Sequence, residues 1–422
     1  MKLWKRVLLA VLLLAVIAGG VLFIVLRQTD AAPSPASPSP SAAPKQQPSS
    51  AGGGGAAPTS ASAPAVVNRS APPQFSVVSA PSGELTAEQA LYSAYLAAYL
   101  KDDGGVISNV GSVSWCPNSC IGCGSDVTSE GIARLARVAA LEGDKQTFDK
   151  VNTYAKTVMR HPETGFLMWK LKSDGSVGGC GGENSAVDGE LILIGARLKA
   201  DATWPNNGYG ADARALMESL KSGLINGSYL PNCMYAQGGK AAACGKTVFL
   251  GYLNLPVLKQ MCNIDPFWCS IHTLNKQLLI RAVQGEGIYS TYYADQNRWA
   301  WENAPIHPQW AMKMLVADGD TDAWAAIQPL YTQARTMFLN NTANGRSEIC
   351  QEFNPSSGCK AVNANLDIYS GYLEMATARN DVVFASALKN YIIEKLHTIS
   401  TKPLAGVDNF QNICTLECLL SS

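Results

Sequence analysis

The chain has 422 residues, with 33 basic and 33 acidic side chains, and only 16% of its residues are charged. It has no basic stripe of the kind that binds nucleic acid and no acidic run of the kind that forms a solvating tail. We therefore expect no nucleic-acid partner. From residue 83 onward the chain is long enough to build one large hydrophobic core.

The N-terminal segment carries a membrane signal. Residues 7–26 are all apolar or small and uncharged, and Lys2, Lys5 and Arg6 precede them. A helix of this length spans about 30 Å, the thickness of the hydrocarbon core of a bilayer. The run ends at Arg27 without the small-residue cleavage pattern of a signal peptide. We expect residues 1–30 to be an uncleaved signal-anchor, with secretion after cleavage as the alternative. The basic residues place the N-terminus in the cytoplasm and everything downstream outside it.

A second compositional change separates the anchor from the rest. Residues 31–82 are rich in Pro, Ala, Ser and Gly and hold too little apolar surface to order themselves, so they predict a flexible linker. Residues 83–422 then form the expected catalytic domain, which we take to be a monomer. Glycosylation sequons at Asn68, Asn226 and Asn340 agree with an extracytoplasmic location.

Twelve cysteines also indicate an oxidising compartment. Three pairs are close enough in sequence to close small loops, so we predict them as local disulfides. They are Cys233–Cys244, Cys262–Cys269 and Cys350–Cys359. The remaining six allow fifteen pairings, and the sequence does not choose among them. These are Cys116, Cys120, Cys123, Cys180, Cys414 and Cys418. Zinc binding by the Cys116 to Cys123 group is an alternative, but no second ligand pair completes it, and we expect no metal and no cofactor.

The domain itself has the pattern of helices. Apolar residues recur at i, i+3 and i+4 in ten segments, with Gly or Asp-Gly breaks between them, whereas β-branched alternation is scarce. These segments predict an all-α ring of antiparallel helices with its function in the loops at one end. They are residues 86–101, 129–142, 145–160, 186–201, 209–223, 271–284, 305–317, 321–340, 363–379 and 381–397.

Four segments carry candidate chemistry. In chain order they are Asp102-Asp103-Gly104-Gly105; Ser129-Glu130-Gly131 at a helix start; Trp169 followed by Ser185-Ala186-Val187-Asp188-Gly189; and Tyr292-Tyr293-Ala294-Asp295 with Arg298 and Trp299. In this order and spacing, from about residue 86 to 400, the chain resembles glycoside hydrolase family 8. Members of that family include endoglucanases, chitosanases, lichenases and xylanases.

The resemblance implies an (α/α)6 barrel, or helical toroid, and an inverting mechanism. It places the general acid on Glu130, the residue that holds the sugar at the cleavage site on Asp188, and the general base on Asp295. The segment after Asp295 departs from the family pattern, so Glu302 is the reserve candidate for the base. The stretch after Gly131, which includes Arg134, also departs from it.

Residue chemistry supports and limits these roles. Glycosidic cleavage needs one carboxyl group that keeps its proton and another that is ionised. A helix N-terminus favours the charged form of Glu130, so burial or the nearby Asp188 must oppose this if Glu130 is the acid. Arg298 beside Asp295 would keep that carboxyl ionised. Each role also has a non-catalytic alternative. Glu130 could only complement the dipole of its helix, Asp188 could be a helix cap, and Asp295 and Arg298 could form a surface ion pair.

We therefore expect a membrane-tethered glycosidase that cleaves β-1,4-type bonds of a polysaccharide. Aromatic and cationic residues expected to line its sugar groove are Trp115, Trp169, Tyr292, Arg298 and Trp299. Two alternatives remain open: a catalytically degenerate glycan-binding protein on the same barrel, and a polysaccharide lyase. The sequence does not identify the polymer.

Overall fold

The computed structural model describes residues 86–108, 126–178, 181–284, 290–300, 308–343, 349–354, 358–363, 366–400 and 409–421. The chain divides into two units, Met1–Ser79 and Ala80–Ser422, and all described elements belong to the second. No helix among the described residues is long and apolar enough to cross a membrane. The predicted anchor, residues 7–26, lies outside them.

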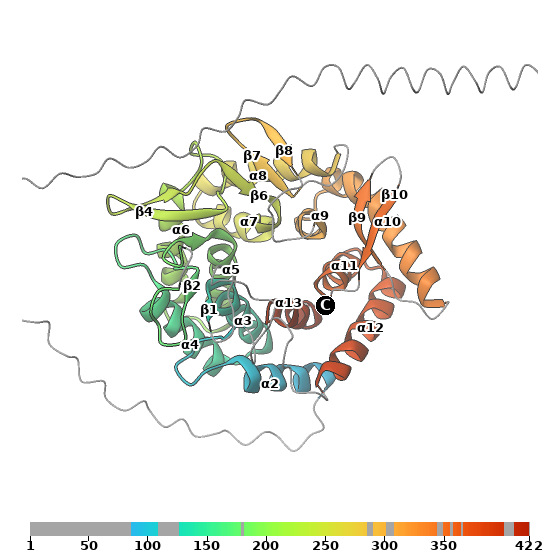
Figure 1. Ribbon diagram of the computed structural model, residues 1–422, viewed down its shortest axis with the longest axis horizontal. Coiled ribbons are helices and arrows are strands. Elements are labelled where there is room, and N and C mark those ends of the chain that lie inside the picture. Colours follow the sequence, from blue (N-terminus) through green and yellow to red (C-terminus); the bar gives the residue numbers. More distant parts are fainter. Residues whose placement is uncertain are drawn as a thin grey trace, which may run out of the picture. The chain divides into compact units, whose positions relative to one another are not determined.

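Helices form two concentric rings in the described part of the second unit (Figure 1). The inner ring closes on itself, because each inner helix contacts the next and the last contacts the first. The inner helices are α3 (Ser129–Glu142), α5 (Val187–Thr203), α7 (Leu255–Ile264), α9 (Pro308–Ala317), α11 (Leu366–Ala378) and α13 (Asn409–Ser421). The outer helices are α2 (Ala87–Tyr99), α4 (Lys145–Tyr154), α6 (Tyr209–Ser222), α8 (Phe267–Gln284), α10 (Thr321–Ala343) and α12 (Val382–Ser400). This arrangement is consistent with the expected (α/α)6 barrel.

Short turns determine the direction of the inner helices. Only Gly143 and Asp144 separate α3 from α4, and three residues separate α9 from α10 and α11 from α12. Such short connections join antiparallel neighbours. The longer segments lead into the inner helices, whose N-termini therefore gather at one end of the barrel. We call this the loop end and the opposite end, where the short turns lie, the turn end.

The sequence explains where these helices begin and end. Thr128 caps α3 by accepting a hydrogen bond from the Gly131 backbone N–H, and Gly143 ends it in a left-handed conformation with φ 74°. Between the caps, Ile132, Leu135 and Ala139 are fully buried in the core. Burial of this apolar face, rather than helix propensity alone, holds α3 against its neighbours.

Small antiparallel sheets occupy the longer connections. Strands this short carry no clear period-two signal, and the sequence analysis missed them. They are β1 (Val127–Thr128) with β2 (Lys170–Leu171); β3 (Ser185–Ala186) with β4 (Cys233–Gln237) and β5 (Lys240–Ala243); β6 (Thr247–Phe249) with β7 (Thr291–Tyr293) and β8 (Arg298–Ala300); and β9 (Ile349–Asn354) with β10 (Gly358–Asn363).

All ten predicted helical segments correspond to helices, and two inner helices, α7 and α13, were missed. α7 has only ten residues and begins with Pro256 near its N-terminus. Residues 413–419 of α13 are all buried, so no polar face marks the helical period there. Both omissions follow from weak or one-sided periodicity.

The cysteines are partly as predicted. Disulfides join Cys233 to Cys244 and Cys262 to Cys269. Cys350 and Cys359 lie on β9 and β10, but their side chains are outside the described set, as are Cys116, Cys120, Cys123 and Cys180. The expectation that the last two cysteines are in disulfides is wrong. Cys414 and Cys418 are buried thiols one turn apart on α13, and Cys418 Sγ donates a hydrogen bond to the Ser370 carbonyl.

Candidate active site

Glu130 lies in the first turn of α3 at the loop end. β1 leads directly into the helix and pairs with β2, and the Ser129 N–H donates to the Trp169 carbonyl at 2.9 Å. Trp169 is itself anchored, since its indole Nε1 donates to the Gly181 carbonyl at 2.9 Å. The start of α3 is therefore fixed from two sides. The predicted sugar-binding residue Trp169 lies beside it.

Asp188 occupies the equivalent place in α5, the next inner helix, as the second residue after β3. The two helix starts approach each other closely through Gly189. A Cβ at Gly189 would lie 2.7 Å from Ser129 Oγ and 3.2 Å from the Glu130 backbone nitrogen. Only glycine permits this approach, which places Asp188 beside Glu130. The Ser129-Glu130-Gly131 motif and the Asp188-Gly189 motif therefore pack directly against each other.

The two carboxyl groups have different surroundings. Glu130 retains 21% side-chain exposure, and its Oε1 accepts from Arg134 Nε at 3.0 Å and Nη2 at 2.8 Å. Asp188 is only 4% exposed, and its Oδ1 has no hydrogen-bond partner among the described residues. Burial, and then the adjacent Glu130, raises the pKa of Asp188 well above its usual range. The site therefore pairs a partly exposed carboxyl group, Glu130, with a buried one, Asp188, whose acidity is weakened.

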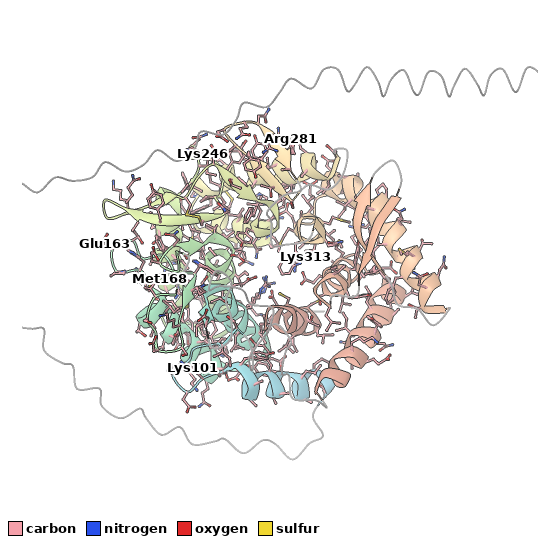
Figure 2. All side chains as sticks on the ribbon, in the orientation of Figure 1. Lys101, Glu163, Met168, Lys246, Arg281 and Lys313 are labelled. Carbon is pink, nitrogen blue, oxygen red and sulfur yellow. A yellow bond between two sulfur atoms is a disulfide. The ribbon has the colours of Figure 1, made fainter. Side chains whose placement is uncertain are left out.

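A cavity of about 500 Å³, which includes open solvent, lies beside Asp188 at the start of α5 and extends among the inner helices. Figure 2 shows Lys313 inside the ring of helices, while Lys101, Lys246 and Arg281 lie at its outer edge. The cavity wall joins acidic, basic and aromatic side chains from all six inner helices or the segments that lead into them. Its chemically important members are Asp188, Arg134, Arg137, Tyr252, Trp310, Lys313, Glu374 and Glu417.

The predicted base, Asp295, lies in the turn between β7 and β8. It is exposed and does not line the cavity. The expected ion pair with Arg298 is not formed. Arg298 Nε instead donates to Gln296 Oε1 at 3.2 Å, and its guanidinium lies 4.4 Å from the Tyr293 ring centre. Because the hairpin is exposed, the long Arg298 side chain can contact any of several neighbours. Its closeness to Asp295 in sequence therefore did not determine its partner.

The other predicted groove residues fall into two groups. Tyr292 is 4% exposed; its hydroxyl donates to Asn297 Oδ1, and its ring packs on Trp299 at 4.8 Å. These two rings support the hairpin rather than the Glu130–Asp188 pair. Trp115 and Glu302 lie outside the described residues.

Several site residues were not singled out by sequence reasoning. Arg134 follows Glu130 by one helical turn, a spacing that signals an i,i+4 ion pair and could have been recognised. Tyr252 and Glu417 had no local signal, since they reach the site only through ring closure. The fully buried Glu190 accepts a hydrogen bond from the Leu167 N–H at 2.7 Å and so holds the preceding loop, which is a structural role. Burial raises its pKa to about 8.

Several solved structures resemble this chain in fold. No curated protein sequence matches. Among solved structures, an alpha-amylase from Clostridium perfringens is 19% identical with a TM-score of 0.64, covering 79% of this chain and 96% of its own. A beta-1,3-1,4-glucanase from Paenibacillus sp. X4 is 15% identical, TM-score 0.59, covering 79% and 90%. The endo-1,4-D-glucanase from Vibrio fischeri ES114 is 15% identical, TM-score 0.58, covering 78% and 93%.

These likenesses show the fold. The family follows from the sequence itself, because residues 95–304 match the family model described as glycosyl hydrolases family 8. The matched region holds both Glu130 and Asp188, the two carboxyl groups that the structure brings together. The chain belongs to glycoside hydrolase family 8 and is a glycosidase.

Proposed function

We propose that this chain is an extracytoplasmic glycoside hydrolase that cleaves β-1,4-type bonds of a polysaccharide by inversion, with Glu130 as the general acid. The observation that carries the proposal is the Glu130–Asp188 pair. Two carboxyl groups from neighbouring helix starts lie together at the loop end, and one is buried with a raised pKa. Such a pair can hold a proton near neutral pH and deliver it to a leaving oxygen.

The two members suit different tasks. Glu130 is the more exposed of the two and can reach the glycosidic oxygen. Asp188 offers the buried Oδ1, which has no partner among the described residues and can accept a hydrogen bond from a sugar hydroxyl. Trp169, beside the start of α3, provides a flat ring for the sugar to stack on.

The base is proposed to be Asp295, with Glu302 as the alternative. Asp295 is exposed and makes no hydrogen bond or ion pair among the described residues, so it is free to bind water. An inverting pair should be separated by about 6.5–9.5 Å to admit that water. Asp295→Asn and Glu302→Gln decide the assignment: the variant of the true base loses hydrolysis while its circular dichroism stays unchanged.

A reducing-sugar screen over cellulose, lichenan, xylan and chitosan tests the activity itself. Release of reducing ends by the wild type, absent in Glu130→Gln, supports the proposal. Proton NMR of the first product then gives the anomer, and inversion predicts the α-anomer from a β-linked polymer. No release from any polymer would favour the degenerate glycan-binding alternative. A product with ultraviolet absorption would indicate a lyase.

An α-linked glucan is the second candidate substrate. The alpha-amylase from Clostridium perfringens has a higher TM-score with this chain than either glucanase reported above. Amylose therefore joins the screen. Hydrolysis of amylose without hydrolysis of the β-glucans would replace the proposed β-1,4 specificity while leaving the role of Glu130 intact.

The proposed location is the outer face of a membrane, with a monomeric catalytic domain tethered by residues 1–30. Support comes from the apolar run at residues 7–26, the basic residues before it and the two disulfides. Retention of the full chain in membranes after alkaline extraction, with degradation by external protease, is the expected result. Recovery in the medium as a shortened chain would favour secretion.

A further inference from the structure

The barrel interior below Glu130 holds a chain of buried ion pairs. Arg134, 2% exposed, binds Glu130 through Nε and Nη2 and binds Glu417 Oε2 through Nη1 at 2.8 Å. The second oxygen of Glu417 forms an ion pair with Arg137 Nε at 3.0 Å. Glu417 is 5% exposed and lies on α13, 283 positions from Arg134. Glu130 is thus connected through one guanidinium to the helix that closes the ring.

Aromatic contact restricts this guanidinium further. The Arg134 Cζ lies 4.6 Å from the Trp310 ring centre, and Lys313 Nζ lies 4.0 Å from the same ring. Lys313 also pairs with Glu374 Oε1 at 2.9 Å. A guanidinium that is bound by two carboxylates and lies against an indole ring, as that of Arg134 does, has little freedom to rotate. Glu130 Oε1 is fixed by that guanidinium, and its other oxygen remains for Asp188 or substrate.

The charges around the cavity identify the proton carrier. Among the described residues, three carboxyl groups and three cations line the cavity, and a fourth carboxyl group, Glu130, is paired with the lining residue Arg134. Arg134 forms ion pairs with Glu130 and Glu417. Arg137 also pairs with Glu417, and Lys313 pairs with Glu374. The remaining carboxyl, Asp188, has no cation of its own in the described part of the chain. A single proton on Asp188 therefore makes the cluster neutral.

The other titratable groups facing this cluster are neutral and do not change the balance. Tyr252, which lines the cavity beside Asp188, has its pKa raised by burial and by the nearby Asp188. Burial likewise raises the pKa of the Cys414 thiol on α13. Neither group supplies a charge near neutral pH.

We propose that Arg134 and Glu417 are positioning residues for the catalytic acid, and that the proton of the Glu130–Asp188 pair rests on Asp188 until a glycan binds. The inference rests on the proposed role of Glu130. In the reaction, Asp188 gives its proton to the free oxygen of Glu130, and Glu130 gives it to the glycosidic oxygen as the C1–O bond breaks. Water forms the new C1–O bond, and its proton passes to the base. In the transition state Asp188 is thus a carboxylate that faces the oxocarbenium-like sugar ring, and it regains a proton when the base releases the one taken from water.

The pH dependence of kcat/KM tests the positioning part. Arg134→Gln removes a cation from the pair and should move the basic limb to higher pH by about one unit. Glu417→Gln removes a carboxylate that shares Arg134 with Glu130. The positive charge of Arg134 then acts on Glu130 alone, so the basic limb should move to lower pH. Arg134→Lys keeps the positive charge but loses the planar guanidinium that binds two carboxyl groups at once. Its limb should stay near that of the wild type while kcat falls roughly 100-fold. The control is Lys259→Gln, an exposed lysine at the turn end with the same charge change.

Opposite shifts in Arg134→Gln and Glu417→Gln support the proposal, since general loosening of the fold would not reverse sign. Shifts in the same direction, or a shift of equal size in Lys259→Gln, overturn it.

Infrared spectroscopy tests the proton's position without using activity. At neutral pH the wild type should show a protonated-carboxyl stretch that disappears in Asp188→Asn but persists in Glu190→Gln. Absence of that difference in an enzyme that hydrolyses glycan overturns this inference alone. A clear Asp188 band in a protein that cleaves no glycan overturns the proposed function and leaves the proton assignment standing.

Discussion

Two buried aspartates at opposite ends of the barrel have opposite acidities. Asp188 lies in the first turn of α5, where the helix dipole favours a carboxylate, yet burial and Glu130 raise its pKa. Asp318 follows the last residue of α9, where the dipole opposes a carboxylate. Burial would also raise the pKa of Asp318, but hydrogen bonds from His272 and Lys276 outweigh it and hold the value at about 2.

The acidities of these two carboxyl groups follow their burial and their direct neighbours rather than the helix dipole. His272 Nε2 and Lys276 Nζ each lie 2.8 Å from Asp318, whose side chain is 1% exposed. Asp188 has an acid for a neighbour instead. The turn end therefore uses a buried carboxylate to hold α8 and α9 together, whereas the loop end holds a buried carboxyl group with a raised pKa, for which we propose a role in the reaction. The following predictions test this division, from the largest expected effect to the smallest.

Glu130→Gln should lower kcat by about 10²–10⁴-fold, the contribution of a general acid. Asp318→Asn should leave kcat within about two-fold of the wild type at a temperature where both are folded. Initial rates on whichever polymer the screen identifies measure both. If Asp318→Asn proves as inactive as Glu130→Gln, the two ends are not functionally separate.

Asp318→Asn should instead reduce the free energy of unfolding by about 3 kcal/mol at pH 7, because His272 and Lys276 lose a buried counter-charge. The pKa of Asp318 is lowered on folding, so its stabilisation is present above about pH 4 and is lost as the pH falls toward 2. Urea unfolding between pH 7 and pH 2 should show that the difference in free energy of unfolding between the variant and the wild type decreases as the pH falls. Asp322→Asn, at an exposed position in the first turn of α10, is the control.

Gly189→Ala should cost about 2 kcal/mol, because its Cβ would lie 2.7 Å from Ser129 Oγ and force α3 from α5. Turnover should fall with it, since Glu130 and Asp188 separate. Gly371→Ala is the matched control on inner helix α11, where a Cβ meets only the Gln309 Cβ at an ordinary 3.7 Å. That substitution should be neutral or stabilising. Equal losses in the two variants would mean that the α3–α5 approach has no special role.

Asp188→Asn should abolish most hydrolysis and yet raise the free energy of unfolding at pH 7 above that of the wild type, because the buried carboxyl group no longer has to be kept from ionising. Because the pKa of Asp188 is raised on folding, the wild type loses stability as the pH rises above about 4, and the variant does not. The stability advantage should therefore vanish near pH 4. Asp295→Asn, at an exposed site, should show no such advantage at either pH.

The sequence allowed the local parts of this picture to be predicted. Caps and apolar periodicity located α3 to the residue, and the spacing of Cys233 and Cys244 revealed their disulfide. The motif around Glu130 and Asp188 predicted their association. What depends on ring closure was not predictable, because Glu417 meets Arg134 across 283 positions and carries no local mark. The hairpin was misjudged for a different reason: Arg298 is exposed, so small energies decide which neighbour it contacts.

The position of Glu417 on α13 has a consequence for synthesis. The inner ring is completed only when residues 409–421 pack against α3 and α11, and those residues are made after all the other described helices. Until then Arg134 has no Glu417 partner, and the wall of the cavity is unfinished on one side. The enzyme should therefore acquire its activity late, in a single final step, and a fragment that stops before residue 409 should fold poorly and be inert.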